Sequence, residues 1–224
     1  MKARILATYH QIHETINDGS IKSLIRKRIF WQRIATPVEM DLTTITPTQD
    51  LSLEPGYSFT EIIISNLQER RYSFAVPSRN YKAYQNLHSE YRCFAIVKDS
   101  TVLGDIWCIT PLDSSNIVNH PDLRMLGIKC RKGQAYAFDM FLDPTYRGKN
   151  LAVPLQRHLH CSLKTDGIKK VYGFYWDDNI PALWMHRMLK FTELPKRRVT
   201  RFFFLYHATF FNQNKTDTQL KRKP

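Results

Sequence analysis

A short basic string about two thirds of the way along the chain could bind phosphate. It reads Arg147-Gly148-Lys149-Asn150-Leu151-Ala152 and follows a turn signal at Asp143-Pro144. Backbone N–H groups at the start of a helix are unpaired and lie at the positive end of the helix dipole, so they attract anions. The Arg and Lys side chains add positive charge, and the glycine lets the backbone approach a ligand closely. An ordinary strand-to-helix turn with exposed cations is the alternative interpretation.

A phosphate site of this kind needs a strand before the string and a helix after it. Gln134–Leu142 is apolar and predicts the strand, and leucines at i, i+4 and i+8 within Gly148–Thr165 predict the helix. Turn signals and apolar patterns predict the other elements: a helix over Phe59–Arg71, a hairpin of Arg92–Lys98 and Val102–Thr110, a strand over Lys170–Tyr175, a helix over Asn179–Lys190 and a strand over Arg201–Phe210. This order predicts an α/β (mixed α+β) layered domain.

The string and a second element downstream resemble those of the GNAT (N-acetyltransferase) superfamily. The string is similar to the family's pyrophosphate-binding signature, Arg/Gln-x-x-Gly-x-Gly/Ala, and Leu142-Asp143-Pro144 stands before it at the family's spacing. The second element has Asn, then a small residue three positions on, an aromatic residue about seven on and Phe twelve on. Here these positions hold Asn179, Ala182, His186 and Phe191. The resemblance covers residues 92–206, about half of the chain.

The resemblance implies a fold and a cofactor. The fold would be a central, mostly antiparallel twisted sheet, flanked by helices and splayed where acetyl-CoA or another acyl-CoA binds. The pyrophosphate would bind the string, the pantetheine arm would lie along the preceding strand, and Asn179 would lie near that arm. The residues assigned to the cofactor in this way are Met140, Phe141, Leu142, Arg147, Gly148, Lys149, Asn150, Leu151, Ala152 and Asn179.

Two residues depart from the family's pattern in the string and its helix. Asn150 stands where the family prefers Gly, and Asn tolerates a left-handed backbone better than other non-glycine residues. Pro154 is harmless only in the first turn of the helix, where its missing N–H is not needed.

His186 and Asp139 are the candidate catalytic residues. The family position of His186 is usually a tyrosine that protonates the departing thiolate, and histidine can act as an acid or a base near neutral pH. Asp139 interrupts an apolar strand, so it could accept the proton of the attacking amine through water. A helix-face histidine and a salt-bridged structural aspartate are the alternatives.

Composition indicates a folded domain with an anionic partner. The 224 residues are 43% hydrophobic and carry a net charge of +13. After residue 180 the chain contains ten Lys and Arg residues but only two acidic residues. This excess of positive charge favours coenzyme A, RNA or acidic lipid as a partner. No apolar run of 18 residues occurs, and no histidine or cysteine pattern fits a metal, so we expect a cytoplasmic chain with no membrane span and no metal.

The domain organisation and function follow from these observations as expectations. Residues 1–40 are expected to form a helical, basic extension, residues 41–211 a GNAT-like domain and residues 212–224 a basic, flexible tail. The expected activity is transfer of an acyl group from acyl-CoA to an amine acceptor, either a small molecule or a protein N-terminus or lysine. An RNA- or ribosome-directed module and a catalytically silent CoA sensor are the alternatives, and a homodimer is left open. The N-terminal 90 residues and the 111–133 connection are expected to shape the acceptor site.

Overall fold

The structure of the chain, a computed structural model, describes residues 30–46, 53–111, 116–202 and 205–211. Its strands are β1 (Phe30–Asp41), β2 (Ser58–Ile62), β3 (Ser73–Phe74), β4 (Arg92–Lys98), β5 (Thr101–Ile109), β6 (Gln134–Leu142), β7 (Lys170–Trp176), β8 (Thr192–Glu193), β9 (Arg197–Phe202) and β10 (Leu205–Phe210). Its helices are α3 (Ile64–Gln68), α4 (Pro77–His88), α5 (Pro121–Leu126), α6 (Ala152–Thr165) and α7 (Ile180–Met188), with short 3-10 turns at Leu42–Thr44 and Pro144–Tyr146.

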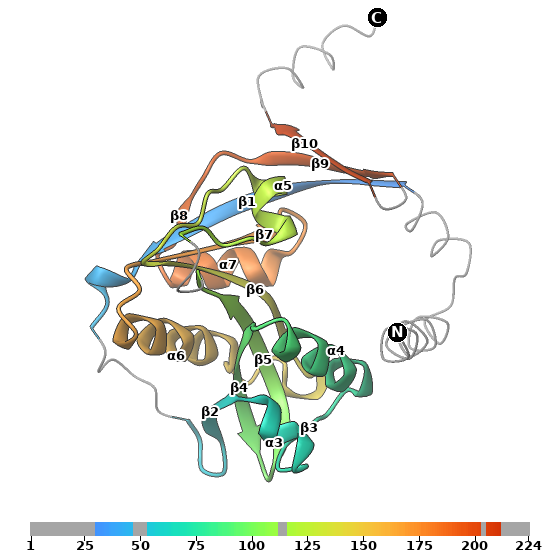
Figure 1. Cartoon of the computed structure of the whole chain (residues 1–224), viewed down its shortest axis with the longest axis vertical. Helices are drawn as coiled ribbons and strands as arrows, with labels where there is room; N and C mark the ends of the chain where they lie inside the picture. The colour runs from blue at the N-terminus through green and yellow to red at the C-terminus, as the bar shows by residue number, and fades with distance from the viewer. Residues whose placement is uncertain (1–29, 47–52, 112–115, 203–204, 212–224) are drawn as a thin grey trace, which may run out of the picture.

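One sheet contains all of these strands (Figure 1). Its order is β10-β9-β1-β7-β6-β5-β4-β2, with β3 beside β5 and β8 beside β1. Only the β6–β7 and β3–β5 pairs are parallel. The expected α/β (mixed α+β) fold with a mostly antiparallel sheet is confirmed.

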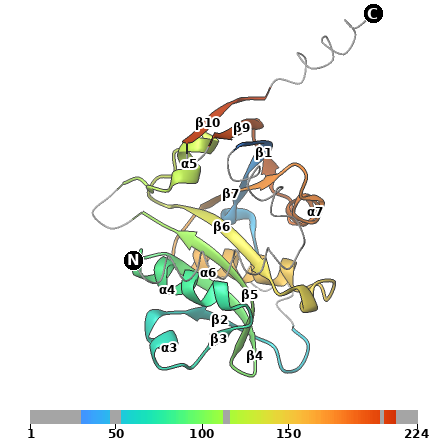
Figure 2. The ribbon, with the colours of Figure 1, turned by 90° about the vertical axis from the view of Figure 1, so that its right-hand side faces the viewer.

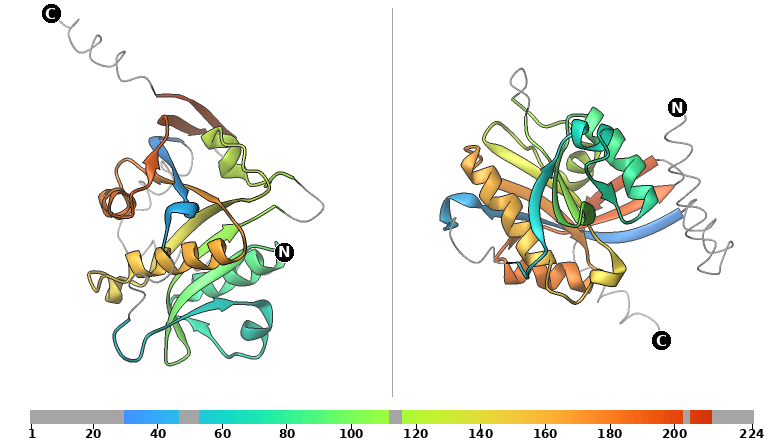
Figure 3. Two further views of the ribbon diagram at one scale, coloured as in Figure 1. Left: turned by 90° about the vertical axis from the view of Figure 1, so that its left-hand side faces the viewer. Right: turned by 90° about the horizontal axis from the view of Figure 1, so that it is seen from below.

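Helices cover both faces of the sheet (Figures 2 and 3). Successive residues of β5 point to opposite faces of the sheet: Ile106 packs in the core under α6, and Trp107 packs in the core under α4. Leu155, Leu159 and Leu163 of α6 are fully buried, as their spacing predicts. The core residues around α7 contact those under α6 through Met40, so α7 lies on the α6 face of the sheet. Helix α5 lies on the α4 face and packs near β10 at one end of the sheet.

The sheet opens between its two central strands. β6 and β7 pair only from Gln134↔Lys170 to Tyr136↔Tyr172, after which β6 continues beside β5 and β7 continues beside β1. A bulge accompanies the opening, because the β5–β6 register shifts there and Asp139 has a φ of 50°. Bulges bend a strand and increase its twist, so β6 turns away from β7 at this point.

The predicted hairpin of Arg92–Lys98 and Val102–Thr110 is confirmed as β4 and β5. Both turn residues, Asp99 and Ser100, have positive φ values of 47° and 63°. Two left-handed residues give a turn whose twist matches that of the flanking strands.

Several local predictions upstream of β4 and at the C-terminus are wrong. The helix expected over Phe59–Arg71 is strand β2 followed by the short helix α3, because the chain is extended at Ile63 (φ −111°, ψ 164°). The strand expected over Arg201–Phe210 is two strands, β9 and β10. The boundary expected at residue 40 falls inside β1, whose residues 30–40 lie within the sheet instead of in a helical extension. Residues 1–29 and 212–224 lie outside the described residues.

Candidate functional site

A cleft of about 870 Å³ lies where β6 and β7 separate. Eight of the twelve candidate residues line it: Asp139, Met140, Phe141, Leu142, Arg147, Ala152, Asn179 and His186. The other four, Gly148, Lys149, Asn150 and Leu151, belong to the loop between Arg147 and Ala152 and do not line the cleft. The fold therefore brings the two sequence elements to the same cavity, one on each wall.

The loop before α6 has a compact shape that depends on two left-handed residues. Gly148 has a φ of 81° and Asn150 a φ of 52°, so Asn150 adopts the conformation for which the family uses glycine. Arg147 donates from Nε to the carbonyl of Leu142 over 3.3 Å, and the Nζ of Lys149 lies 4.8 Å from the centre of the Tyr146 ring. Two cations thus flank the loop.

The N-terminus of α6 is available to an anion. Leu151 is its N-cap residue, and no side chain of the described residues caps it. Pro154 is the third helical residue, so it lies in the first turn, where its missing N–H leaves no helical hydrogen bond unmade. A 14-residue helix adds the positive end of its dipole to the N–H groups of this turn.

Asn179 begins α7 on the opposite wall. Its side-chain oxygen accepts a hydrogen bond from the backbone N–H of Ala182 over 3.2 Å, which is the contact of an N-cap residue. The spacing from Asn to Ala that carries the family resemblance is therefore a helix-capping contact in this structure.

His186 lies one turn after Ala182 in α7 and is 8% exposed. Its Nδ1 lies 2.7 Å from the carbonyl of Ala182, and since a carbonyl only accepts, Nδ1 carries the proton. The ring stacks on Tyr175 with a centroid distance of 5.3 Å. Burial lowers the pKa of His186, so at neutral pH its Nε2 is unprotonated and can accept a proton.

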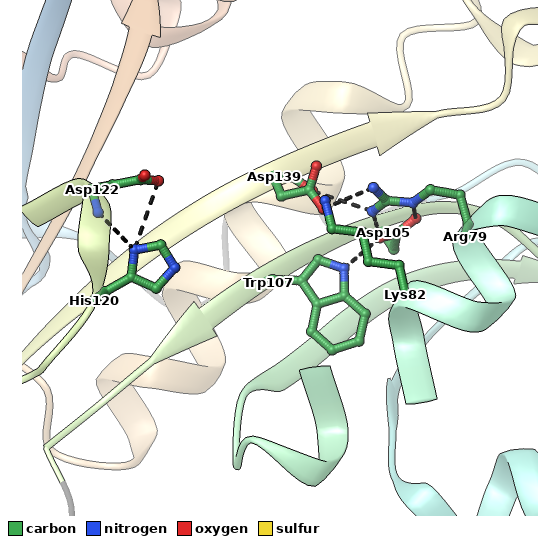
Figure 4. Close-up of polar contacts among 7 residues, drawn as sticks. All are labelled: Arg79, Lys82, Asp105, Trp107, His120, Asp122 and Asp139. Carbon is green, nitrogen blue, oxygen red and sulfur yellow. Dashed lines mark hydrogen bonds and ion pairs between the residues drawn. The ribbon is translucent and has the colours of Figure 1, made fainter. Parts of the chain in front are cut away.

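Asp139 takes part in a network of charges on the other side of the cleft (Figure 4). Its carboxylate accepts from Nη1 of Arg79 over 2.8 Å and lies 2.6 Å from Nζ of Lys82. Arg79 also binds Asp105, which accepts a third bond from the indole N–H of Trp107 at 2.7 Å. Burial raises the pKa of Asp105 to about 6, although Arg79 opposes this.

Arg79, Lys82 and Asp105 belong to the site although no sequence pattern indicates them. The polar segment that forms α4 shows little periodicity, so it predicted no element. The contact between Arg79 and Asp139 joins residues 60 apart in the chain, and no local pattern signals it.

A second polar group lies in the same cleft and was also missed. His120 and Asp122 come from the start of α5, within the 111–133 connection, and line the cleft with Tyr91 and Phe138. Nδ1 of His120 accepts from the backbone N–H of Asp122 over 3.2 Å, and the hydroxyl of Tyr136 donates to the Asp122 carboxylate over 2.9 Å. His120-Pro121-Asp122 carries a signal that could have been read, since an N-cap residue before proline begins a helix.

The described residues contain neither a candidate metal-ligand cluster nor a helix that could span a membrane. They contain no group of three or more His, Cys, Asp or Glu side chains that could hold a metal ion. Among the described helices, none is long and apolar enough to cross a bilayer.

Comparison with known proteins rests on structure alone. No protein-family model matches the chain, and no curated protein matches it either. A fungal multi-domain GH3 β-N-acetylglucosaminidase with a GCN5-related glucosamine N-acetyltransferase region is similar, with a TM-score of 0.55 and 14% identity over 81% of this chain and 22% of that chain. A tandem GNAT protein from the clavulanic acid biosynthesis pathway has a TM-score of 0.50 and 15% identity over 80% of this chain and 53% of its own.

A third structure has a similar fold and a similar coverage. A Drosophila protein has a TM-score of 0.50 and 6% identity over 80% of this chain and 54% of its own. The chain thus spans about half the length of the tandem GNAT and Drosophila proteins and about a fifth of the fungal one. Together with the splayed sheet and the two elements at the cleft, these matches show that the chain has the fold of the GNAT acetyltransferases.

Proposed function

We propose that the chain is an N-acyltransferase that moves an acyl group from acyl-CoA to an amine. One observation carries the proposal: beyond Tyr136 and Tyr172 the facing edges of β6 and β7 have no strand partner among the described residues, and a cleft lies between them. The basic loop and the start of α6 follow β6, and the Asn179–His186 element lies on the opposite wall. A thioester that lies between the strands would have its phosphates at the loop.

The loop before α6 would bind the CoA pyrophosphate. The N–H groups from Arg147 to Ala152 and the dipole of α6 favour an anion, and the cations of Arg147 and Lys149 are close to the loop. The positive φ of Gly148, with no heavy atom within 4 Å of a Cβ built there, leaves room for a phosphate oxygen.

The pantetheine arm would pair with the end of β6. From Ala137 to Leu142 this strand pairs with β5 on one side, and on the β7 side it has no strand partner among the described residues. Backbone groups on an open edge form hydrogen bonds with an extended ligand, as in the addition of a strand to a sheet. Met140, Phe141 and Leu142 are the residues at this edge.

The reaction would be a direct transfer. The amine nitrogen forms a bond to the thioester carbonyl carbon, the C–S bond breaks, and CoA leaves as a thiolate. A neutral amine loses one proton as the amide forms, and the thiolate gains one. An amine that binds as an ammonium first gives up a further proton, which passes to a base of the cleft and then to solvent. Asp139, which Arg79 and Lys82 keep beside the cleft, can take up the amine proton through water, and the unprotonated Nε2 of His186 is a second acceptor. Most of the rate would come from positioning.

Thermal unfolding with CoA species tests the proposal. Acetyl-CoA at about 100 times its dissociation constant should add about 2.7 kcal/mol to the free energy of unfolding, which raises the melting temperature of a chain of this size by about 5–10 °C. The acyl chain with the largest shift identifies the donor, and turnover is then measured on a panel of amines. A shift without turnover on any amine would support the silent CoA sensor, and no shift with any CoA species would overturn the proposal.

A further inference from the structure

One end of the cleft is lined by aromatic side chains. Tyr91, His120 and Phe138 line this end. Their ring centroids are 4.5 Å apart for His120–Phe138, 5.1 Å for Tyr91–Phe138 and 5.7 Å for Tyr91–His120. Three rings that contact one another form a continuous apolar wall, which can cover the body of a ligand that enters from the open side.

Asp122 brings a negative charge to this wall that no cation of the described residues neutralises. Its side chain is 33% exposed, and its only ion-pair contact in the described part of the chain is the Nδ1 of His120 at 3.7 Å. That nitrogen accepts the backbone N–H of Asp122, and burial lowers the pKa of His120, so the ring is neutral at pH 7. The buried hydroxyl of Tyr136, which donates over 2.9 Å, holds the carboxylate in place.

Asp139, the other carboxylate of the cleft, is in the opposite situation. Figure 4 shows it in contact with Arg79 and Lys82, while Asp122 stands apart with His120. Two cations already satisfy the Asp139 carboxylate, so a ligand cation gains less there than at Asp122. Among the described residues, the two cations nearest to Asp139 are already paired, because Arg79 contacts Asp105 and Asp139 and Lys82 contacts Asp139, so they offer little to a ligand carboxylate.

We propose that Asp122 binds the cationic amine of the acceptor, whose apolar or aromatic body lies against Tyr91, His120 and Phe138. The inference rests on the proposed function, because it assigns the acceptor end of the same cleft. The acceptor class is a primary amine on an apolar body that carries no carboxylate, in contrast to an α-amino acid. Asp122 has a binding role here, and a cation over aromatic rings adds to the attraction.

Titration calorimetry with 2-phenylethylamine and 2-phenylethanol tests the inference at pH 7. The two probes share a phenylethyl group and differ in charge. Each is titrated into the chain alone and into the chain saturated with free CoA, because free CoA carries no acyl group to transfer. We expect the wild-type chain to bind the amine at least about 10-fold more tightly than the alcohol. Asp122→Asn should lower the affinity for the amine by about 10- to 100-fold and leave the affinity for the alcohol unchanged. Asn keeps an oxygen for the hydroxyl of Tyr136.

Asp99→Asn is the matched control. It makes the same change of charge at an exposed turn residue with a φ of 47°, which asparagine tolerates, and it should bind both probes as the wild type does. Equal affinity of the wild type for amine and alcohol would overturn the inference without any variant. An amine affinity unchanged by Asp122→Asn, even with a lower melting temperature, would assign Asp122 to the support of α5 alone and would also overturn it. Binding of CoA is measured in the same experiment, so its absence overturns the proposed function separately.

Discussion

Arg79 of α4 donates a hydrogen bond from Nη1 to the carboxylate of Asp139 over 2.8 Å, at the bulge where β6 leaves β7. The same guanidinium binds Asp105 of β5, so one buried cation connects a helix, a strand and the bulge. The position of the cleft wall therefore depends on a charge network as well as on strand pairing.

Arg79→Met should lower the free energy of unfolding by about 3–5 kcal/mol, because it leaves the buried Asp105 without its cation. Urea titration measures the loss. Arg71→Met is the control, since Arg71 pairs with Glu69 on the surface and should contribute at most about 1 kcal/mol. A loss at Arg79 no larger than that at Arg71 would show that the network does not stabilise the fold.

Gly148→Val should weaken CoA binding by about 10-fold or more, because the new side chain would occupy the approach to the phosphate loop. Gly167→Val separates this effect from backbone strain. Both glycines have a φ near 80° and no heavy atom within 4 Å of a built Cβ, so both variants should lose a similar stability, on the order of 1–2 kcal/mol. Calorimetry with CoA compares them, and equal affinities would place the phosphates elsewhere.

His186→Gln should reduce kcat by about 100-fold and leave CoA binding unchanged if His186 takes part in proton transfer. Burial lowers the pKa of His186, so the reactive neutral form predominates at pH 7, and kcat should fall as the pH drops below 6.5 toward that lowered value. This acidic decline should be missing in the variant. Burial also lowers the pKa of His158, which lies outside the cleft, so His158→Gln is the control and should keep the wild-type profile. A kcat that instead falls as the pH rises through this range would identify His186 as an acid.

Acidification should destabilise the fold through His160. Burial lowers its pKa to about 3, and the nearby His186 acts in the same direction. The unfolded chain binds a proton at His160 near pH 6.5 and the folded chain only near pH 3. This contribution to stability is therefore complete above pH 6.5 and is lost as the pH falls, by on the order of 4 kcal/mol at pH 3. His160→Gln should make the free energy of unfolding, measured by urea titration, depend less on pH. His88→Gln, at an exposed site, should leave that pH dependence unchanged.

The elements around the cleft could be predicted from the sequence because their signals are local. The leucine spacing of α6, the turn after Leu142 and the offsets from Asn179 to Phe191 each lie within one or two elements. The error over Phe59–Arg71 has a local cause too, since apolar residues of a strand and of a following helix were read as one helical face.

The end of the cleft that we propose for the acceptor could not be predicted residue by residue, because its contacts join distant parts of the chain. Tyr91 meets Phe138 and His120 only after β4, β5 and β6 have paired. His120 and Asp122 of the 111–133 connection line the cleft, and the expectation that this connection and the N-terminal 90 residues shape the acceptor site stays a prediction. The sequence around these two residues signals the start of a helix, with His120 before a proline, but nothing in it indicates that they line a cleft.

The central place of β1 determines when the sheet can be completed. β1 lies between β7 and β9, and its Thr36 contacts Asp177 across 141 positions of the chain. A ribosome that makes 5–20 residues per second would therefore expose β1 for many seconds before its neighbours exist. Non-local pairing of this kind slows folding. Until β7 is synthesised, both edges of β1 can pair with other chains, so this segment is exposed to aggregation during synthesis.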